Sequence, residues 1–295
     1  MTEQSSNGNS RKNEKADVVT YKVGLMKFTG DDCLITSYKL KYDMPLNDDL
    51  KWMTGLNGTF VRMSNEARKW ACLRGHVITI EGLIGAGKST LGRSLVAYLK
   101  GLGLDATFYS EFVHLPLLEQ YIGDMKKYGY GFQIIMVKER LRIYKIASEA
   151  AKRGIIAIVD RCMLGDIAFA KMLYDQGIIK EDEWNIYLSL IKKEKIIEPS
   201  LTVYLNCSAK EAYRRMVSRS NDAEVSGYTL EYFQRLEKSY EQIIYGVKPP
   251  LRRIDWEEPR KTYVEKINQE KKHYLFDLEC EKVLLEIRNY LINPI

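Results

Sequence analysis

The chain has 295 residues, 45% of them hydrophobic and 28% charged, so it can bury a substantial core. Its formal net charge is +6, a mild excess that requires no nucleic-acid partner. No apolar run approaches the length of a membrane span, and the amino-terminal residues lack the hydrophobic core of a signal peptide. We therefore expect a cytoplasmic protein with no membrane partner. The five cysteines are odd in number and widely spaced, which favours free thiols over a disulfide framework or a zinc site.

The first 74 residues divide by composition. Residues 1–16 are polar and rich in Ser, Asn and Lys, which predicts a disordered tail. Residues 17–74 form an amino-terminal extension of unknown role. Two partly alternating segments in it, Val19–Phe28 and Leu34–Tyr42, predict a β-rich hairpin. Extra strands packed on the core are the default interpretation, and an oligomerisation arm or a partner site are the alternatives.

Residues 75–295 show the pattern of an α/β domain. Strands are predicted at His76–Ile80, Ala106–Ser110, Ile155–Asp160, Leu201–Asn206 and, on a weaker pattern, Leu251–Trp256. Helices are predicted at Ser89–Gly101, Leu115–Lys127, Phe132–Lys152, Gly165–Gln176, Lys180–Lys195, Ala209–Ser218, Leu230–Tyr245 and Phe276–Ile292. This alternation predicts a five-stranded parallel sheet with helices on both faces, whose strands end at one shared edge.

The most informative stretch is Glu81–Thr90, which follows the first strand and opens the first helix. Its G-x-x-x-x-G-K-[ST] pattern in that context predicts a phosphate-binding loop, with backbone N–H groups turned towards a nucleoside triphosphate. Lys88 would neutralise the β- and γ-phosphates, and the Ser89 hydroxyl would hold Mg²⁺. A chance glycine-rich turn is the alternative, which the flanking strand and helix disfavour. The residues predicted to bind ATP here are Gly82, Gly85, Ala86, Gly87, Lys88, Ser89 and Thr90.

Two polar patterns follow the loop. Glu111 comes directly after the second strand, where a carboxylate could take a proton from an attacking hydroxyl, although a surface glutamate is the simpler interpretation. Gln133 and Arg140 are seven residues apart, which is two helical turns, so they share a helix face. A planar amide beside a planar guanidinium can recognise the edge of a nucleobase. A solvated glutamine and an ion-paired arginine are the alternative.

A third pattern ends the third strand. Asp160 could hold Mg²⁺ through water, and Arg161 could stabilise charge that develops on a phosphoryl group. Asp166 could pair with Arg140, or it could simply be an acid favoured at the start of a helix.

Taken together, these residues resemble the deoxyribonucleoside kinase family of phosphate-loop kinases. The resemblance runs from about Val77 to Gly246 and rests on the ordered set I-E-G-x-I-G-x-G-K-[ST], E-x-V, F-Q, D/E-R and the later Leu230–Tyr232. The phosphate loop alone occurs in many kinases, whereas the ordered set is much more specific. A composition rich in Lys, Ile and Tyr suits an AT-rich genome, a viral one included.

The resemblance implies roles for individual residues. Glu111 matches the base that deprotonates the 5′-hydroxyl, and Gln133 matches the glutamine that pairs with the nucleobase. Asp160 and Arg161 match a Glu-Arg pair, with a shorter carboxylate here. Tyr121 lies near the tyrosine that contacts the 3′-hydroxyl, after a one-residue gap.

Further matches concern the base pocket and a lid over the phosphates. Arg140 and Asp166 match the arginine and aspartate of deoxycytidine and deoxyguanosine kinases. Arg215 and Arg219, one helical turn apart, match lid arginines that contact the triphosphate. Glu224 matches an acid near the 3′-hydroxyl, in an alignment that needs an insertion. Asn221 stands where the family usually has another arginine, and the family's tryptophan after the catalytic glutamate is absent.

We therefore expect transfer of the ATP γ-phosphoryl group, with Mg²⁺, to the 5′-hydroxyl of a deoxynucleoside in nucleotide salvage. Gln133, Arg140 and Asp166 favour deoxycytidine or a purine deoxynucleoside over thymidine. The resemblance also implies a homodimer. Thymidylate kinase, whose Asp-Arg motif is closer to Asp160–Arg161, is one alternative. A non-catalytic nucleotide-binding protein is the other, motivated by the unassigned extension and the missing lid arginine.

Overall fold

The computed structural model describes residues 52–54, 60–62, 68–194, 198–219, 222–246, 250–257 and 282–292. The chain divides into two units, residues 1–68 and 69–295. In the first unit, strand β1 (Trp52–Thr54) pairs antiparallel with β2 (Phe60–Arg62). The predicted tail and the strands predicted at 19–28 and 34–42 lie outside the described residues.

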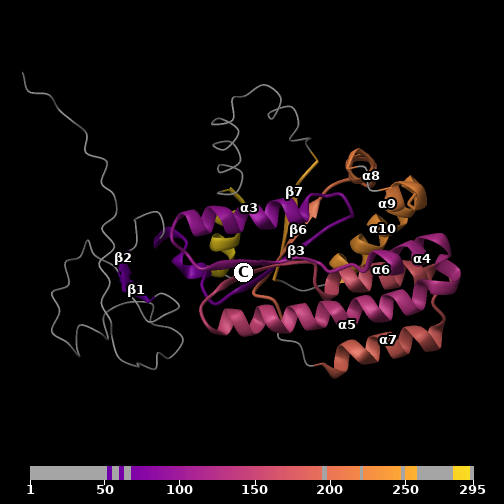
Figure 1. The fold of residues 1–295 in the computed structure, drawn as a ribbon, viewed down its shortest axis with the longest axis horizontal. Helices are drawn as coiled ribbons and strands as arrows, with labels where there is room; N and C mark the ends of the chain where they lie inside the picture. Colours follow the sequence, from indigo (N-terminus) through magenta and orange to yellow (C-terminus); the bar gives the residue numbers. More distant parts are fainter. Residues whose placement is uncertain are drawn as a thin grey trace, which may run out of the picture. The chain divides into compact units, whose positions relative to one another are not determined.

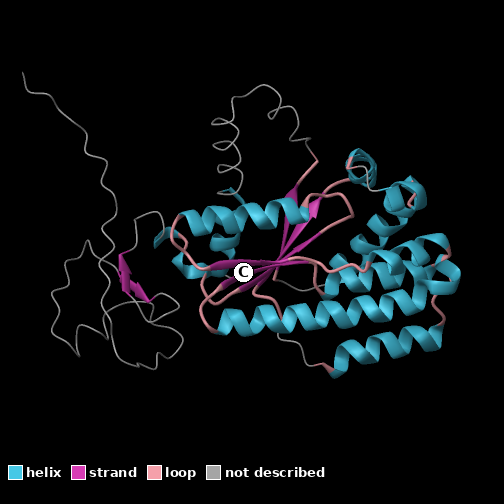
Figure 2. Ribbon diagram, viewed as in Figure 1, coloured by secondary structure: helices cyan, strands magenta, loops and turns pink. Residues whose placement is uncertain are grey.

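The second unit is built on a five-stranded sheet (Figure 2). Its strand order is β4-β5-β3-β6-β7, and every neighbouring pair is parallel. The strand bounds are Val77–Glu81 for β3, Ala106–Tyr109 for β4, Ile156–Asp160 for β5, Leu201–Asn206 for β6 and Leu251–Asp255 for β7. The predicted five-stranded parallel sheet is therefore confirmed, including its last strand.

Helices cover both faces of this sheet. Figure 1 shows α3 on one side of the strands and α5 with α7 on the other. The helix bounds are Lys88–Gly101 for α3, Leu115–Gly123 for α4, Met125–Lys152 for α5, Met163–Asp175 for α6, Glu181–Lys193 for α7, Ala209–Ser218 for α8, Asp222–Gly227 for α9 and Leu230–Gly246 for α10. A short 3₁₀ turn, η1 (Ala71–Leu73), precedes β3.

The central strands read as continuous apolar runs because both of their faces are covered. All five residues of β3 and all five of β5 are buried. On α3, the residues Leu91, Leu95 and Leu99 recur every four positions and are fully buried against the sheet. The apolar spacing of the sequence therefore translates directly into this layer of the core.

The break between α4 and α5 differs from the predicted one. The sequence predicts a gap between Lys127 and Phe132, where two glycines stand, whereas the chain breaks at Asp124. The Asp124 carboxylate accepts a hydrogen bond from the Lys127 N–H at 3.0 Å and so caps α5. Gly129 lies inside α5, where an added Cβ would sit 3.0 Å from the Ile178 side chain, so it serves close packing instead of a turn. The short helix α9 was not predicted.

The end of the chain is helical over residues 282–292, within the helix predicted from 276 onwards. Val283, Leu284, Ile287 and Tyr290 are buried, which agrees with a helix that packs one face on the core. The Arg252 guanidinium of β7 lies over the Tyr290 ring at 4.8 Å. Among the described residues, no helix combines the length and the apolar character that a membrane crossing requires.

Two glycines of α3 give a matched test of its packing. A Cβ at Gly92 would lie 2.2 Å from the Phe108 ring of β4, whereas a Cβ at Gly101 would meet nothing within 4 Å. We expect Gly92→Ala to lower the free energy of unfolding by about 1–3 kcal/mol through overpacking. Gly101→Ala should raise it by up to about 1 kcal/mol because alanine loses less backbone entropy. Urea denaturation of both variants measures this, and equal effects would contradict the packing of α3 on β4.

Candidate active site

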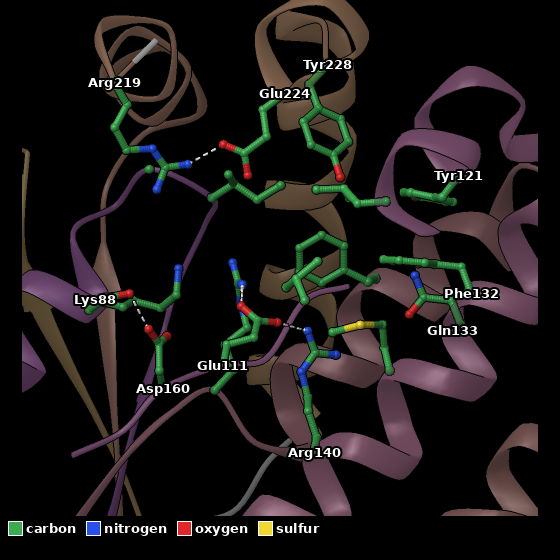
Figure 3. A pocket seen from close by; sticks show the side chains of 18 residues that line it. Lys88, Glu111, Tyr121, Phe132, Gln133, Arg140, Asp160, Arg219, Glu224 and Tyr228 are labelled. Atoms are coloured by element: carbon green, nitrogen blue, oxygen red, sulfur yellow. Dashed lines mark hydrogen bonds and ion pairs between the residues drawn. The ribbon is translucent and has the colours of Figure 1, made fainter. Parts of the chain in front are cut away.

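A cavity opens at the carboxyl edge of the sheet, where β3, β4 and β5 end (Figure 3). The phosphate loop lies on one side of it and residues of α4 and α5 on the other. Most of the predicted site residues line it together, although they come from segments far apart in the sequence: Gly85, Lys88, Ser89, Glu111, Tyr121, Gln133, Arg140, Asp160, Arg161, Arg219 and Glu224. The predicted convergence at one sheet edge is what the structure shows.

The phosphate loop requires its glycines. Gly82, Gly85 and Gly87 have φ angles of 143°, 77° and 98°, a region that residues with a Cβ rarely adopt. A Cβ at Gly85 would also lie 2.4 Å from the Ala212 carbonyl oxygen of α8. The loop therefore passes too close to α8 for any side chain at this position. Ala86 is buried, and Thr90 lies exposed in the first turn of α3.

Lys88 is buried at the start of α3. Its Nζ donates a hydrogen bond to the Leu83 carbonyl oxygen at 2.6 Å, across the turn of the loop. Burial lowers the pKa of Lys88 to about 7 and Arg161 adds to this, while Asp160, Glu111 and Glu81 oppose it. A phosphate bound in the loop would favour the charged ammonium, because an anion nearby stabilises a cation.

Ser89 and Asp160 form the candidate metal site. The Ser89 hydroxyl donates to Oδ2 of Asp160, and the two residues meet where α3 begins and β5 ends. The other oxygen, Oδ1 of Asp160, is buried and has no hydrogen-bond partner among the described residues. A hydroxyl beside a carboxylate oxygen with free lone pairs is a donor set that suits Mg²⁺ with several waters.

Glu111 joins two arginines. Its carboxylate accepts a hydrogen bond from Nη2 of Arg140 through Oε1 and one from Nη1 of Arg161 through Oε2. Burial would raise the pKa of Glu111, but Arg161, Arg140 and Lys88 outweigh burial and lower the pKa to about 2. The carboxylate is therefore ionised and held in one orientation at the cavity wall.

Arg140 in turn joins Glu111 to Asp166. Nη1 of Arg140 donates to Oδ2 of Asp166, and the Tyr187 hydroxyl of α7 donates to Oδ1 at 2.6 Å. Asp166 is fully buried, and burial raises its pKa although Arg140 and Tyr187 act in the opposite direction. Both of its oxygens are thus paired, as a buried carboxylate requires. The predicted pairing of Arg140 with Asp166 is present in the structure.

The opposite wall presents a flat apolar surface with one amide. The rings of Phe132 and Tyr121 stack at 4.4 Å with an angle of 7° between their planes. Gln133 is 1% exposed, and its Oε1 has no hydrogen-bond partner in the described part of the chain. Figure 3 shows this side chain beside Phe132 and above Arg140. An unpaired buried amide oxygen beside aromatic rings is suited to a planar, hydrogen-bonding ligand.

Tyrosines and the lid close the upper end of the cavity. The Tyr121 hydroxyl hydrogen-bonds the Tyr232 hydroxyl at 3.0 Å, and Tyr228 lines the cavity beside them. Glu224 of α9 forms an ion pair with Arg219, the C-cap residue that follows α8. These two residues of the predicted lid therefore contact each other where they line the cavity (Figure 3).

The two lid arginines differ in position. Arg219 lines the cavity, whereas Arg215 donates to the Ala86 carbonyl oxygen at 3.3 Å and to the Trp256 carbonyl oxygen at 2.9 Å. Arg215 also pairs with Glu211 one turn earlier. Arg215 thus ties α8 to the phosphate loop and to the segment after β7.

Several residues of the site carried no assigned role in the sequence. Tyr228, Phe169 and Met136 line the cavity, and Tyr187 binds Asp166 from α7. The spacing of Met136 from Gln133 and Arg140 on one helix face was a usable signal. Tyr187 and Phe169 had no comparable signal, because their contacts depend on how α6 and α7 pack.

The arginine contacts of Glu111 predict an acid-dependent stability. Because its pKa falls from 4.5 to about 2 on folding, the group stabilises the fold above pH 4.5, and that contribution is lost as the pH falls towards 2. The contribution is on the order of 1–3 kcal/mol. We expect the difference in unfolding free energy between wild type and Glu111→Gln to shrink between pH 6 and pH 3, measured by urea denaturation. Glu149→Gln, which alters an exposed side chain, is the control. A difference in unfolding free energy between wild type and Glu111→Gln that stays constant from pH 6 to pH 3 would contradict the prediction.

Comparison with known proteins agrees with this geometry. The chain is 33% identical over 190 residues to deoxyadenosine kinase from Dictyostelium discoideum, covering 63% of this chain and 74% of the relative. It is 29% identical over 175 residues to a deoxyadenosine/deoxycytidine kinase from Bacillus subtilis, covering 58% and 77%. A solved structure of deoxyadenosine kinase from M. mycoides with bound dATP superposes with a TM-score of 0.53 at 30% identity, covering 64% of this chain and 95% of that one. The family model for deoxynucleoside kinase matches residues 78–292, and the chain therefore belongs to the deoxynucleoside kinase family.

Proposed function

We propose that this kinase transfers the γ-phosphoryl group of ATP to the 5′-hydroxyl of a deoxyribonucleoside in nucleotide salvage. One observation carries the proposal: the phosphate loop with Lys88 shares a single cavity with Glu111 and with the amide oxygen of Gln133, which has no partner among the described residues. A donor phosphate on the loop and a nucleobase at Gln133 would leave the sugar between them, beside Glu111. This arrangement brings the two reactants into one geometry, which is a large part of catalysis for phosphoryl transfer.

Glu111 is the proposed base. With two arginines on its carboxylate its pKa is about 2, which is far below the value suited to proton abstraction near neutral pH. A nucleobase that draws Arg140 away would leave Glu111 with Arg161 alone and raise that pKa. In a loose transition state the hydroxyl proton leaves late, so Glu111 chiefly orients the 5′-oxygen and then accepts the proton.

The cations around the loop stabilise the transferred charge. Lys88 and Arg161 lie on the β3–β5 side of the cavity, and Arg219 approaches from the lid. Mg²⁺ held by Ser89 and Asp160 would neutralise charge on the phosphate oxygens. Closure of the lid would exclude water, which keeps ATP from idle hydrolysis.

The base pocket favours deoxycytidine or a purine deoxynucleoside over thymidine. Gln133 offers an acceptor and two donors, and Arg140 adds donors while Asp166 holds it in place. A base without matching groups would leave these buried polar atoms unpaired, which selects strongly against it. The similar proteins named for deoxyadenosine and deoxycytidine support the same preference.

The proposed homodimer would use the outer face of α5 and α7. Ile135 and Ile146 stand three turns apart on α5 and are 41% and 48% exposed, and Ile186 of α7 is 53% exposed. A second chain packed over these exposed aliphatic side chains would remove them from water, which favours association.

The first kinetic prediction concerns Lys88 and Glu111. We expect Lys88→Ala and Glu111→Gln each to lower kcat by at least about 100-fold, because each removes a group positioned on the reacting atoms. Steady-state ADP release with deoxyadenosine and deoxycytidine measures it. Lys100→Ala, at the far end of the same helix, should keep wild-type turnover. Near-normal turnover of Glu111→Gln would refute its assignment as base.

The second kinetic prediction concerns base selection. We expect thymidine to have a kcat/KM at least about tenfold below that of the best other deoxynucleoside, because its base leaves buried polar groups unpaired. Asp166→Asn should reduce the ratio of kcat/KM for the best other deoxynucleoside to kcat/KM for thymidine, because it removes the charge that holds Arg140. Tyr187→Phe, which keeps the contact between Arg140 and Asp166, should reduce it less. Thymidine as the best substrate would overturn the assignment of the base pocket.

A further inference from the structure

Glu81 is a buried carboxylate that the proposed reaction does not use. It is the last residue of β3, it is fully buried, and it directly precedes the phosphate loop. A carboxylate in this position is unfavourable unless its oxygens are hydrogen-bonded. Its contacts therefore indicate what it does.

Those contacts join three segments. Oε1 of Glu81 accepts hydrogen bonds from the backbone N–H groups of Cys162 at 2.7 Å and Gly165 at 3.1 Å. The Tyr240 hydroxyl of α10 lies 3.3 Å from Oε2 of Glu81 and 3.3 Å from the Gly82 carbonyl oxygen. The end of β3 is thereby linked to the start of α6 and to the middle of α10.

At α6 the carboxylate acts as a cap supplied by another strand. Cys162 is the N-cap residue of α6, and its own side chain makes no capping hydrogen bond. Glu81 instead satisfies the free N–H of Gly165, the third residue of the helix, and places a carboxyl group at the positive end of the helix dipole. The start of α6 is therefore fixed relative to β3.

Between β5 and this cap stands Arg161, with a φ angle of 63°. Among the described residues, Arg161 is the one non-glycine residue with a positive φ angle. This left-handed conformation persists only where the surrounding structure imposes it. From this turn the Arg161 guanidinium donates to Glu111 and, at 3.2 Å, to the Gly82 carbonyl oxygen. The hydrogen bond that the Cys162 N–H donates to Glu81 holds the residue directly after Arg161.

The site is also built to admit Glu81 closely. A Cβ at Gly165 would lie 2.4 Å from Oε2 of Glu81 and 2.8 Å from the Tyr240 hydroxyl. Only glycine leaves space for the carboxylate at this position. Burial raises the pKa of Glu81 to about 7, and Oε1 can accept both backbone hydrogen bonds whether or not Oε2 carries a proton.

We infer that Glu81 is a positioning residue for the reaction: its carboxyl group holds the turn at Arg161 and the start of α6 in register with the phosphate loop. Arg161 then reaches the transferring phosphoryl group and Glu111 in one fixed geometry. This inference rests on the proposed role of Arg161 in transition-state stabilisation. The inference requires the length of the Glu81 side chain rather than its charge, since the groups that hydrogen-bond it, two backbone N–H groups and the Tyr240 hydroxyl, are neutral.

Two substitutions separate the effect of the length of the Glu81 side chain from the effect of its charge. E81Q keeps the length and the acceptor oxygen but removes the charge, whereas E81D keeps the charge and withdraws the carboxylate by about 1.5 Å. T79V is the matched control, because Thr79 is buried in the same strand and its hydroxyl bonds Thr202 at 2.9 Å, away from the turn. Each variant is measured by kcat, by KM for ATP and deoxynucleoside, and by amide hydrogen exchange over residues 162–165.

We expect E81D to lower kcat about 30- to 100-fold with KM changed by less than about threefold, the scale for a misplaced catalytic group. Its amide exchange at residues 162–165 should accelerate. E81Q should retain kcat within about fivefold and exchange like wild type. T79V should lose thermal stability and keep kcat.

E81D with kcat equal to or above E81Q, or with unaltered exchange at residues 162–165, would overturn the inference. So would a loss in E81D no greater than in T79V. If E81D does not fold, Gly165→Ala displaces the same carboxylate and must show the same faster exchange. A wild-type protein that phosphorylates no nucleoside would contradict the proposed function, while the exchange measurement would still decide whether Glu81 holds the turn.

Discussion

Buried charges of opposite sign alternate across the carboxyl edge of this sheet, and the site depends on their contacts. Asp166 binds Arg140, Arg140 binds Glu111, and Glu111 binds Arg161. Each of these charges would be costly to bury alone and is tolerable only with its neighbour in place. This series of ion pairs, from Asp166 to Arg161, also connects the proposed base pocket at one end to the phosphate loop at the other. A nucleobase that contacts Arg140 would therefore act on Glu111 through a single guanidinium.

The strands and helices of the fold hold the residues of this series of ion pairs in place. β3 leads into the phosphate loop, β5 ends at Asp160 and leads into Arg161, and α5 carries Gln133 and Arg140 on its buried face. Close backbone contacts keep these parts together, as where Gly85 meets α8 and Gly165 meets Glu81. Parallel strands end at the same edge, so short connections suffice to bring residues from four segments into one cavity.

Local patterns in the sequence were enough to predict the sheet, the phosphate loop and the shared face of Gln133 and Arg140. These features depend on periodicity and on glycine placement, which are visible within a few residues. The break between α4 and α5 was predicted at residues 128–131 but lies at Asp124, and Gly129 instead packs inside α5 against Ile178. The contacts of Glu81 and Tyr187 could not be predicted, because they depend on how α6, α7 and α10 pack on the sheet.

The phosphoryl acceptor that we propose for this cavity is a nucleoside hydroxyl rather than a nucleoside monophosphate. Apart from the cations near the phosphate loop, the described cavity wall on the acceptor side is lined by Glu111, Gln133 and tyrosines. Arg140 also lies there, but it is already paired with two carboxylates. The most direct measurement is ADP release with ATP and Mg²⁺ when deoxynucleosides and their 5′-monophosphates are offered separately. We expect turnover with deoxyadenosine or deoxycytidine and little with any monophosphate. Faster turnover with thymidine monophosphate than with every deoxynucleoside would contradict it.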